Sequence, residues 1–270
     1  MYKYYLNLGN SSLIFMSQAP SSDRHLVVNF QPTSRKQSHI ISKVLSPAVR
    51  LWLRSQVEQV EDLQVKIQGG DRAILTGYIP KVSLSARQAV YQGLHLREIQ
   101  LAAVNIAINL GQVLKGKALR LLEPIPVTGE LKLQQADLQE SLKSSLLSNA
   151  LTEFLLLLLK EGGCPNRAEI LQNRQISWNS IAIEPGKIAI EGAMSDHSSQ
   201  NTYPLLINAA IELASPNQLE LIDAQIEGLP NLNLASLNGL KLDLGSDVDL
   251  QELTLTAGQL ICRGGILVRG

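Results

Sequence analysis

The sequence predicts an α+β protein in which a strongly twisted antiparallel sheet wraps around one or two helices to form a half barrel. Stretches with strand-like alternation follow one another directly, without the crossover helices that a parallel sheet requires. The leucine run 155–159 lies in a predicted helix that lacks a polar stripe for nearly two turns, so other elements must surround it. The apolar face of the stretch 94–110 changes parity twice, as it does in a bent or bulged strand.

Residues 1–36 are rich in Ser, Asn, Gln and Pro, so we expect a loosely ordered N-terminal extension followed by a single domain over 37–270. The first helix is predicted within 38–60, and Pro47 marks either its start or a kink. One continuous helix is predicted over 136–160. The stretch 94–110 is either one strongly bent strand or two strands with a tight break. Strands are predicted at 62–68, 72–91, 93–111 and 117–135, and then at 175–193, 203–214, 218–229, 237–247, 249–258 and 259–268.

Composition and charge exclude several classes of function. The 270 residues have no net charge, but 1–123 holds 15 basic and 7 acidic residues, whereas 124–270 holds 9 and 17. Aromatic residues make up only 4%, too few for base-stacking platforms, so we expect no nucleic-acid partner. Cys164 and Cys262 lie far apart, and the acidic group at 243–252 lacks the spacing of a calcium loop. We therefore expect no metal and no cofactor.

Enzyme signatures are absent from the sequence. No glycine-rich nucleotide loop, zinc-protease motif or nucleophile elbow is present, and the four histidines are scattered, so we predict a protein that is not an enzyme. The first 20 residues lack the apolar core of a signal peptide, and no apolar run approaches the roughly 20 residues of a membrane span. We expect a cytoplasmic protein, either free or peripheral on a membrane.

Four motifs resemble the LmeA-like phospholipid-binding family. They are A-V-Y-Q-G-L-H-L-x-x-I at 89–99, N-I-x-I at 105–108, P-I-P-V at 124–127 and D-L-x-x-x-L at 137–142. The resemblance covers about residues 40–260. It implies one unit of the tubular lipid-binding fold, a long helix wrapped by a twisted sheet, and it implies binding of phospholipid with transfer or membrane docking as related activities. The family supplies no catalytic residues that could be assigned here.

We expect an acyl lipid to bind in an elongated aliphatic cavity between the helices and the sheet. The alternative is a fully packed core, in which protein side chains alone cover the leucines. The predicted lining is apolar except for one tyrosine and consists of Leu45, Val49, Trp52, Leu53, Tyr91, Ile106, Ile108, Leu147, Leu151, Phe154, Leu155 and Leu158.

The first predicted helix is also a candidate for membrane docking. The segment 35–54 holds five cations and no acid. Three of these cations, Lys43, Arg50 and Arg54, flank Trp52, as in an interfacial helix on anionic lipid. The ordinary alternative is an amphipathic helix that packs its apolar stripe on the sheet and leaves its cations in solvent.

The favoured function is therefore non-enzymatic binding, extended by transfer, of a phospholipid or another acyl lipid, with an anionic membrane surface as a further partner. A second hypothesis is a protein-interaction scaffold with a packed core and a partner on a sheet edge or on the helix 136–160. A third is a lipid-modifying enzyme whose polar groups converge at the mouth of the cavity. A homodimer is an additional option, because a single unit of this fold leaves an exposed end or edge.

Overall fold

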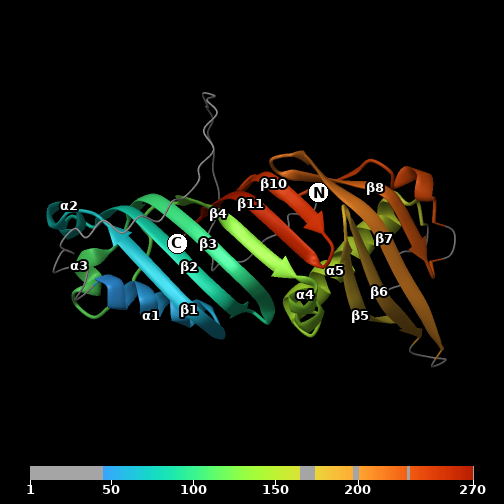
Figure 1. Cartoon of the computed structure of the whole chain (residues 1–270), viewed down its shortest axis with the longest axis horizontal. Coiled ribbons are helices and arrows are strands. Elements are labelled where there is room, and N and C mark those ends of the chain that lie inside the picture. Colours follow the sequence, from blue (N-terminus) through green and yellow to red (C-terminus); the bar gives the residue numbers. More distant parts are fainter. Residues whose placement is uncertain (1–44, 165–173, 197–200, 230–231, 270) are drawn as a thin grey trace.

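The computed structural model describes residues 45–164, 174–196, 201–229 and 232–269. It confirms the predicted α+β class, with two open and entirely antiparallel sheets that carry a few helices. The two sheets follow one another along the length of the molecule, with α4 between them (Figure 1). The predicted N-terminal extension over 1–36 and the predicted docking residue Lys43 lie outside the described residues.

The first sheet has six strands in the order β1-β2-β3-β4-β11-β10, so the last two strands of the chain complete a sheet begun by the first four. Three helices lie at its free end (Figure 1). Its strands are β1 (Gln59–Gln68), β2 (Tyr78–Tyr91), β3 (Leu94–Ala107), β4 (Ile125–Gln134), β10 (Val248–Thr256) and β11 (Gln259–Val268), and its helices are α1 (Ser46–Gln56), α2 (Asp71–Leu75) and α3 (Leu110–Val113).

The second sheet has five strands in sequence order, β5-β6-β7-β8-β9. The longest helix, α5, packs against this sheet, and a short 3-10 helix, η2, lies beside β8. These elements are α4 (Gln135–Ser141), α5 (Ser145–Glu161), β5 (Arg174–Glu184), β6 (Lys187–Asp196), β7 (Thr202–Ser215), β8 (Gln218–Glu227), η2 (Leu234–Ser236) and β9 (Leu240–Asp243).

The stretch with two parity changes is one bent strand, β3, rather than two strands with a break. Its neighbourhood contains residues with left-handed backbone: Asp62, Gln88 and Asn105 have φ of 45°, 48° and 56°. The β1–β2 ladder shifts register on both sides of Glu61. Such bulges bend a strand and increase its twist, so they curve this sheet.

The predicted continuous helix over 136–160 is wrong. Two helices, α4 and α5, meet there at 92°. Ser144 has an extended backbone and caps α5, because its Oγ accepts a hydrogen bond from the N–H of Leu147 at 3.2 Å. Serine competes with the helical backbone in this way, which explains the break. Within the described parts of the chain, no single helix is long and apolar enough to cross a membrane.

The leucine run in α5 is covered on one side only. Leu155, Leu158 and Leu159 are completely buried against the second sheet, whereas Leu156 is 37% exposed. The other exposed positions of α5 are Ser145, Asn149, Ala150, Glu153, Lys160 and Glu161, of which only Ala150 is apolar. The inference that this helix has no polar stripe is therefore wrong. Positions 145, 149, 153, 156 and 160 follow one another at intervals of three or four residues and form one stripe, in which only Leu156 is apolar.

Two glutamines of α4 join the two sheets. The side-chain oxygen of Gln135 accepts a hydrogen bond from Ile183 N at 2.9 Å, and that of Gln139 accepts one from Ile181 N at 3.1 Å. At the β10–β11 turn, Gly258 N donates to the carbonyl of Ile183 at 2.8 Å. The unpaired backbone groups at the edge of β5 are thus hydrogen-bonded to α4 and to the β10–β11 turn, so this edge of the second sheet is covered.

Apolar side chains form two core clusters. One lies beneath α1 and includes Leu45, Val49, Ile67 and Ile106. The other lies between α5 and the second sheet, and the ends of β4 and β10 contribute to it. The fold therefore has a closed core at each end, and the middle of the six-stranded sheet lies between them.

Candidate functional site

The inner face of the six-stranded sheet carries a row of side chains that neither core encloses. Strand register places Val65, Leu84, Leu101, Gly129 and Gly264 opposite one another. A second row runs from Ile99 through Leu131 and Cys262 to Leu253. Because side chains alternate between faces, both rows share a face with the residues beneath α1. We call their half-buried apolar members the apolar strip: Val65, Leu84, Ile99, Leu101, Leu131, Leu253 and Cys262.

The apolar strip joins the two core clusters. Leu101 packs against the cluster beneath α1, whereas Leu131 and Leu253 pack against the cluster beneath α5. Burial in this apolar environment raises the pKa of the Cys262 thiol, which keeps it neutral. The strip is thus a continuous aliphatic surface that the described residues cover only in part.

Two glycines keep the middle of the strip shallow. A Cβ on Gly129 would collide with the carbonyl oxygen of Gln100, and one on Gly264 would collide with that of Asp249. Neither position can carry a side chain without moving the neighbouring strand. Glycine in a strand interior often marks a place where a ligand or another chain approaches the backbone closely.

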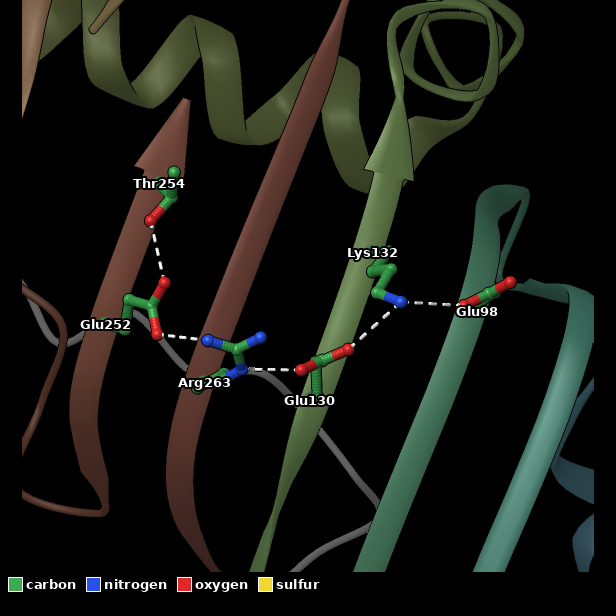
Figure 2. A network of polar contacts seen from close by, with 6 residues as sticks. All are labelled: Glu98, Glu130, Lys132, Glu252, Thr254 and Arg263. Atoms are coloured by element: carbon green, nitrogen blue, oxygen red, sulfur yellow. Dashed lines mark hydrogen bonds and ion pairs between the residues drawn. The ribbon is translucent and has the colours of Figure 1, made fainter. Parts of the chain in front are cut away.

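The outer face of the same strands is charged (Figure 2). Lys132 on β4 bonds to Glu98 on β3 at 3.1 Å and to Glu130 at 3.2 Å. Arg263 on β11 pairs with Glu130 and with Glu252 on β10. This ladder of ion pairs crosses four strands, so the sheet presents polar groups on its outer face and aliphatic groups on its inner face.

The ladder also shifts the ionisation of its members. Burial alone would raise the pKa of Glu130, but hydrogen bonds from Arg263 and Lys132 outweigh it and lower the pKa. Hydrogen bonds to Glu98 and then Glu130 raise the pKa of Lys132. Hydrogen bonds from Thr254 and Arg263 lower the pKa of Glu252. The charged forms are therefore favoured in the folded protein.

Replacing Glu130 with glutamine should lower the free energy of unfolding by about 1 kcal/mol at neutral pH, since partly exposed ion pairs contribute about that much. A lowered carboxylate pKa stabilises the fold above the ordinary glutamate pKa, and this contribution disappears as the pH falls through the lowered value. Urea unfolding of wild type and E130Q at about pH 7 and about pH 3 measures the difference, which should shrink in acid. Equal losses at both pH values would contradict the role of the charge, and the exposed Glu153→Gln is the matched control.

Two hollows lie near the junction of the sheets. One, of about 380 Å³, lies where β1, β2, β3 and α4 meet, and its lining includes Gln88, His95, Arg97 and Asp137. The other, of about 560 Å³, lies between the start of α4 and the β10–β11 turn. The predicted leucines line neither hollow, so the elongated aliphatic cavity stays a prediction.

The described residues offer no site for a metal ion, because no three His, Cys, Asp or Glu side chains among them gather suitably. The acidic group at 243–252 is engaged elsewhere. Asp247 pairs with Arg269 at 2.8 Å, Glu252 pairs with Arg263, and a carboxylate oxygen of Asp243 accepts a hydrogen bond from Gly245 N at 2.9 Å.

A comparison with known protein families shows which family this chain belongs to. A model of the family described as LmeA-like phospholipid-binding matches residues 37–265. The chain belongs to the LmeA-like phospholipid-binding family. No curated protein and no solved structure matched the chain. The resemblance that the motifs indicated is confirmed, and the LmeA-like family is one of phospholipid-binding proteins rather than a known enzyme family.

The first LmeA-like motif forms the β2–β3 hairpin, which fits into the elbow between α4 and α5. Gly93 has φ +75°, and a Cβ there would lie 2.7 Å from Cβ of Ser144. His95 N donates to Oγ of Ser141 at 2.8 Å. Glycine is needed at this position for both its backbone conformation and its closeness to the elbow.

The D-L-x-x-x-L motif of the LmeA-like family holds α4 in place. Asp137 accepts two hydrogen bonds from Arg97, at 2.8 and 3.1 Å, and one from Gln134 N at 2.9 Å. It therefore caps the helix from its first turn and also ties the helix to β3. Leu138 and Leu142 are buried in the core beneath α5.

The predicted lipid-binding residues divide between the two cores of the LmeA-like fold. Leu45, Val49, Ile106 and Ile108 are buried beneath α1, with Trp52 and Leu53 at the margin of that cluster. Leu151, Leu155 and Leu158 are buried beneath α5, with Leu147 and Phe154 at its margin, and Tyr91 is half-buried at the end of β2. Of the predicted docking residues, Arg50 and Arg54 are exposed on α1. The set thus borders the apolar strip from both ends and does not gather around one point.

Sequence reasoning missed most of the apolar strip. A signal was present in the sequence, because Leu84, Leu101 and Leu131 each lie on the apolar face of a stretch with strand-like alternation. Alternation identifies the apolar face of a strand, but it does not indicate which part of that face a helix covers.

Proposed function

We propose that this protein binds a phospholipid, or another acyl lipid, by placing acyl chains along the apolar strip. The observation that carries the proposal is a half-buried aliphatic surface that joins two closed cores and backs onto a charged outer face, in a member of a phospholipid-binding family. The ion-paired outer face points to the inner face as the apolar ligand surface.

The dimensions of the strip suit an acyl chain. Neighbouring strands are about 4.8 Å apart, so the first row, from β1 to β11, spans four gaps, or roughly 19 Å. One leaflet of a bilayer contains about 15 Å of hydrocarbon, half of the roughly 30 Å core. Burial of an acyl chain contributes about 0.8 kcal/mol for each methylene, so even partial coverage supplies substantial affinity.

The predicted lining residues take two roles in this proposal. Trp52, Leu53, Leu147 and Phe154, at the margins of the cores, flank the bound chains. The completely buried leucines of α5 hold the second sheet in place. Docking on an anionic membrane and transfer of the lipid extend the proposal, and the exposed Arg50 and Arg54 of α1 support docking.

Native mass spectrometry of the purified full chain tests the proposal. We expect a bound species whose mass matches a phospholipid, released by organic extraction. A protein that carries no lipid and takes up none from phosphatidylcholine vesicles would overturn the proposal. A stoichiometric protein partner in place of lipid would favour the interaction scaffold instead.

A further inference from the structure

The most exposed large apolar residues among those described lie at one end of the molecule. Leu51, Leu122, Leu75 and Leu114 are 72%, 64%, 60% and 54% exposed, whereas every other exposed large apolar residue described is at 40% or less. Leu51 lies on α1, Leu75 ends α2, Leu114 follows α3, and Leu122 precedes β4. These helices share the free end of the six-stranded sheet (Figure 1).

Hydrogen bonds hold the chain around α2 and the chain around α3 together at this end. Ile108 N donates to the carbonyl of Gly77, just after α2, at 2.8 Å, and Leu122 N donates to the carbonyl of Ala107 at 2.9 Å. The side chain of Asn109 donates to the carbonyl of Ala118 at 3.0 Å and accepts from the N–H of Arg120 at 2.7 Å. We call the assembly of 71–77 and 108–122 the tip.

Two of the three exposed leucines of the tip have a buried neighbour, and the third, Leu122, follows Leu121, which is partly buried against the core beneath α1. Ile74 is fully buried next to Leu75, and Leu110 is buried one turn before Leu114. Both belong to the core beneath α1. The exposed leucines therefore project from anchored segments, and their exposure is a property of the folded tip.

The tip is also basic. The segment 110–122 carries Lys115, Lys117 and Arg120 and no acid, with Glu123 immediately after it. All three cations are exposed, and none forms an ion pair with another residue that the structure describes. Arg72 on α2 adds a cation beside Asp71, which is engaged in an interaction of its own. Leucines that project among unpaired cations match a bilayer of anionic lipid, which offers hydrocarbon beneath negative head groups.

We infer that the tip is the surface by which this protein inserts into an anionic phospholipid bilayer. The inference rests on the proposed lipid binding and names the membrane contact that would deliver the lipid. Leu75, Leu114 and Leu122 enter the acyl boundary, while Lys115, Lys117 and Arg120 contact the phosphates. Along β2 the apolar strip starts at Leu84, six residues beyond Tyr78 at the tip, so it stands about 20 Å from the bilayer.

Flotation of the full chain with vesicles tests the inference. Wild type should bind equimolar phosphatidylcholine and phosphatidylglycerol, bind pure phosphatidylcholine weakly, and lose affinity as salt rises. The variant Lys115→Gln/Lys117→Gln/Arg120→Gln should lose about a hundredfold in affinity for the anionic vesicles. The variant Leu75→Ser/Leu114→Ser/Leu122→Ser should lose at least tenfold on the same vesicles. Leu234→Ser, at an exposed leucine near the second sheet, is the matched control and should bind as wild type does.

The outcomes separate this inference from the proposed function. Tip variants that remain folded should keep their co-purified lipid, because the apolar strip is intact. Unchanged vesicle binding by both tip variants would overturn the inference and leave lipid binding standing, and so would a loss confined to Arg50→Gln/Arg54→Gln on α1. Vesicle binding through the tip by a protein that holds no lipid would sustain the inference and overturn the proposed function. A wild type that binds no anionic vesicle overturns the inference outright.

Discussion

Replacement of both Leu101 and Leu131 by glutamine should reduce phospholipid binding at least tenfold while the protein remains folded. Both side chains lie in the middle of the apolar strip, on adjacent strands, and both are only half-buried. A leucine that contacts an acyl chain contributes roughly 1 kcal/mol or more, and about 1.4 kcal/mol corresponds to a tenfold change in affinity. Uptake of a fluorescent phospholipid from vesicles, measured for wild type and variant, provides the ratio.

The matched control for this prediction lies on the opposite face of the same sheet. Thr128→Gln places the same side chain on the exposed outer face of β4. It should leave lipid uptake unchanged. Leu131→Met, which preserves volume and apolar character, should retain most of the binding. Equal uptake by wild type and a folded double variant would mean that the strip is not the lipid site.

Replacement of Leu158 by alanine should destabilise the protein by about 2–5 kcal/mol, the usual cost of removing a fully buried leucine. The residue is completely buried between α5 and the second sheet, so truncation leaves a cavity in that core. For a chain of this size, each kcal/mol lowers Tm by about 2–4 °C. Thermal unfolding followed by circular dichroism measures the shift.

Leu156 is the control within the same leucine run. It is 37% exposed on the outer side of α5, so Leu156→Ala should cost less than about 1 kcal/mol. A loss as large as that of L158A would show that the outer side of α5 is packed as tightly as the inner side. A loss that appears only when bound lipid is present would place lipid on this side of the helix.

The fold class could be predicted because it depends on local patterns. Alternation in successive stretches without intervening helices indicated antiparallel sheets, and the family motifs at 89–99 and 137–142 indicated the relationship. The division into two sheets could not be predicted, since β11 pairs with β4 across more than a hundred residues and adds β10 to the same sheet. The break at Ser144 was missed because leucines repeat at helical spacing on both sides of it.

The site was only partly predictable for the same reason. Leu158 and Leu156 are identical residues two positions apart, yet one is buried and the other is exposed. Helical periodicity could have distinguished them only through the polar residues at 149, 153 and 160, which lie on the same face of the helix as Leu156. For the apolar strip, no local pattern distinguishes Leu101 from Ala103, although only Ala103 lies within the closed core beneath α1.

The sequence by itself determined the apolar and polar faces of the strands, the residues that cap α4, and the basic segment before β4, because each depends on residue type and on spacing within a few positions. Only the tertiary structure decided which apolar residues are enclosed. That outcome depends on where α1 and α5 lie on the two sheets, and hence on pairings between segments far apart in the chain. The cores beneath α1 and α5 each take in one end of the strip, so the residues that the structure describes leave its middle only half-buried.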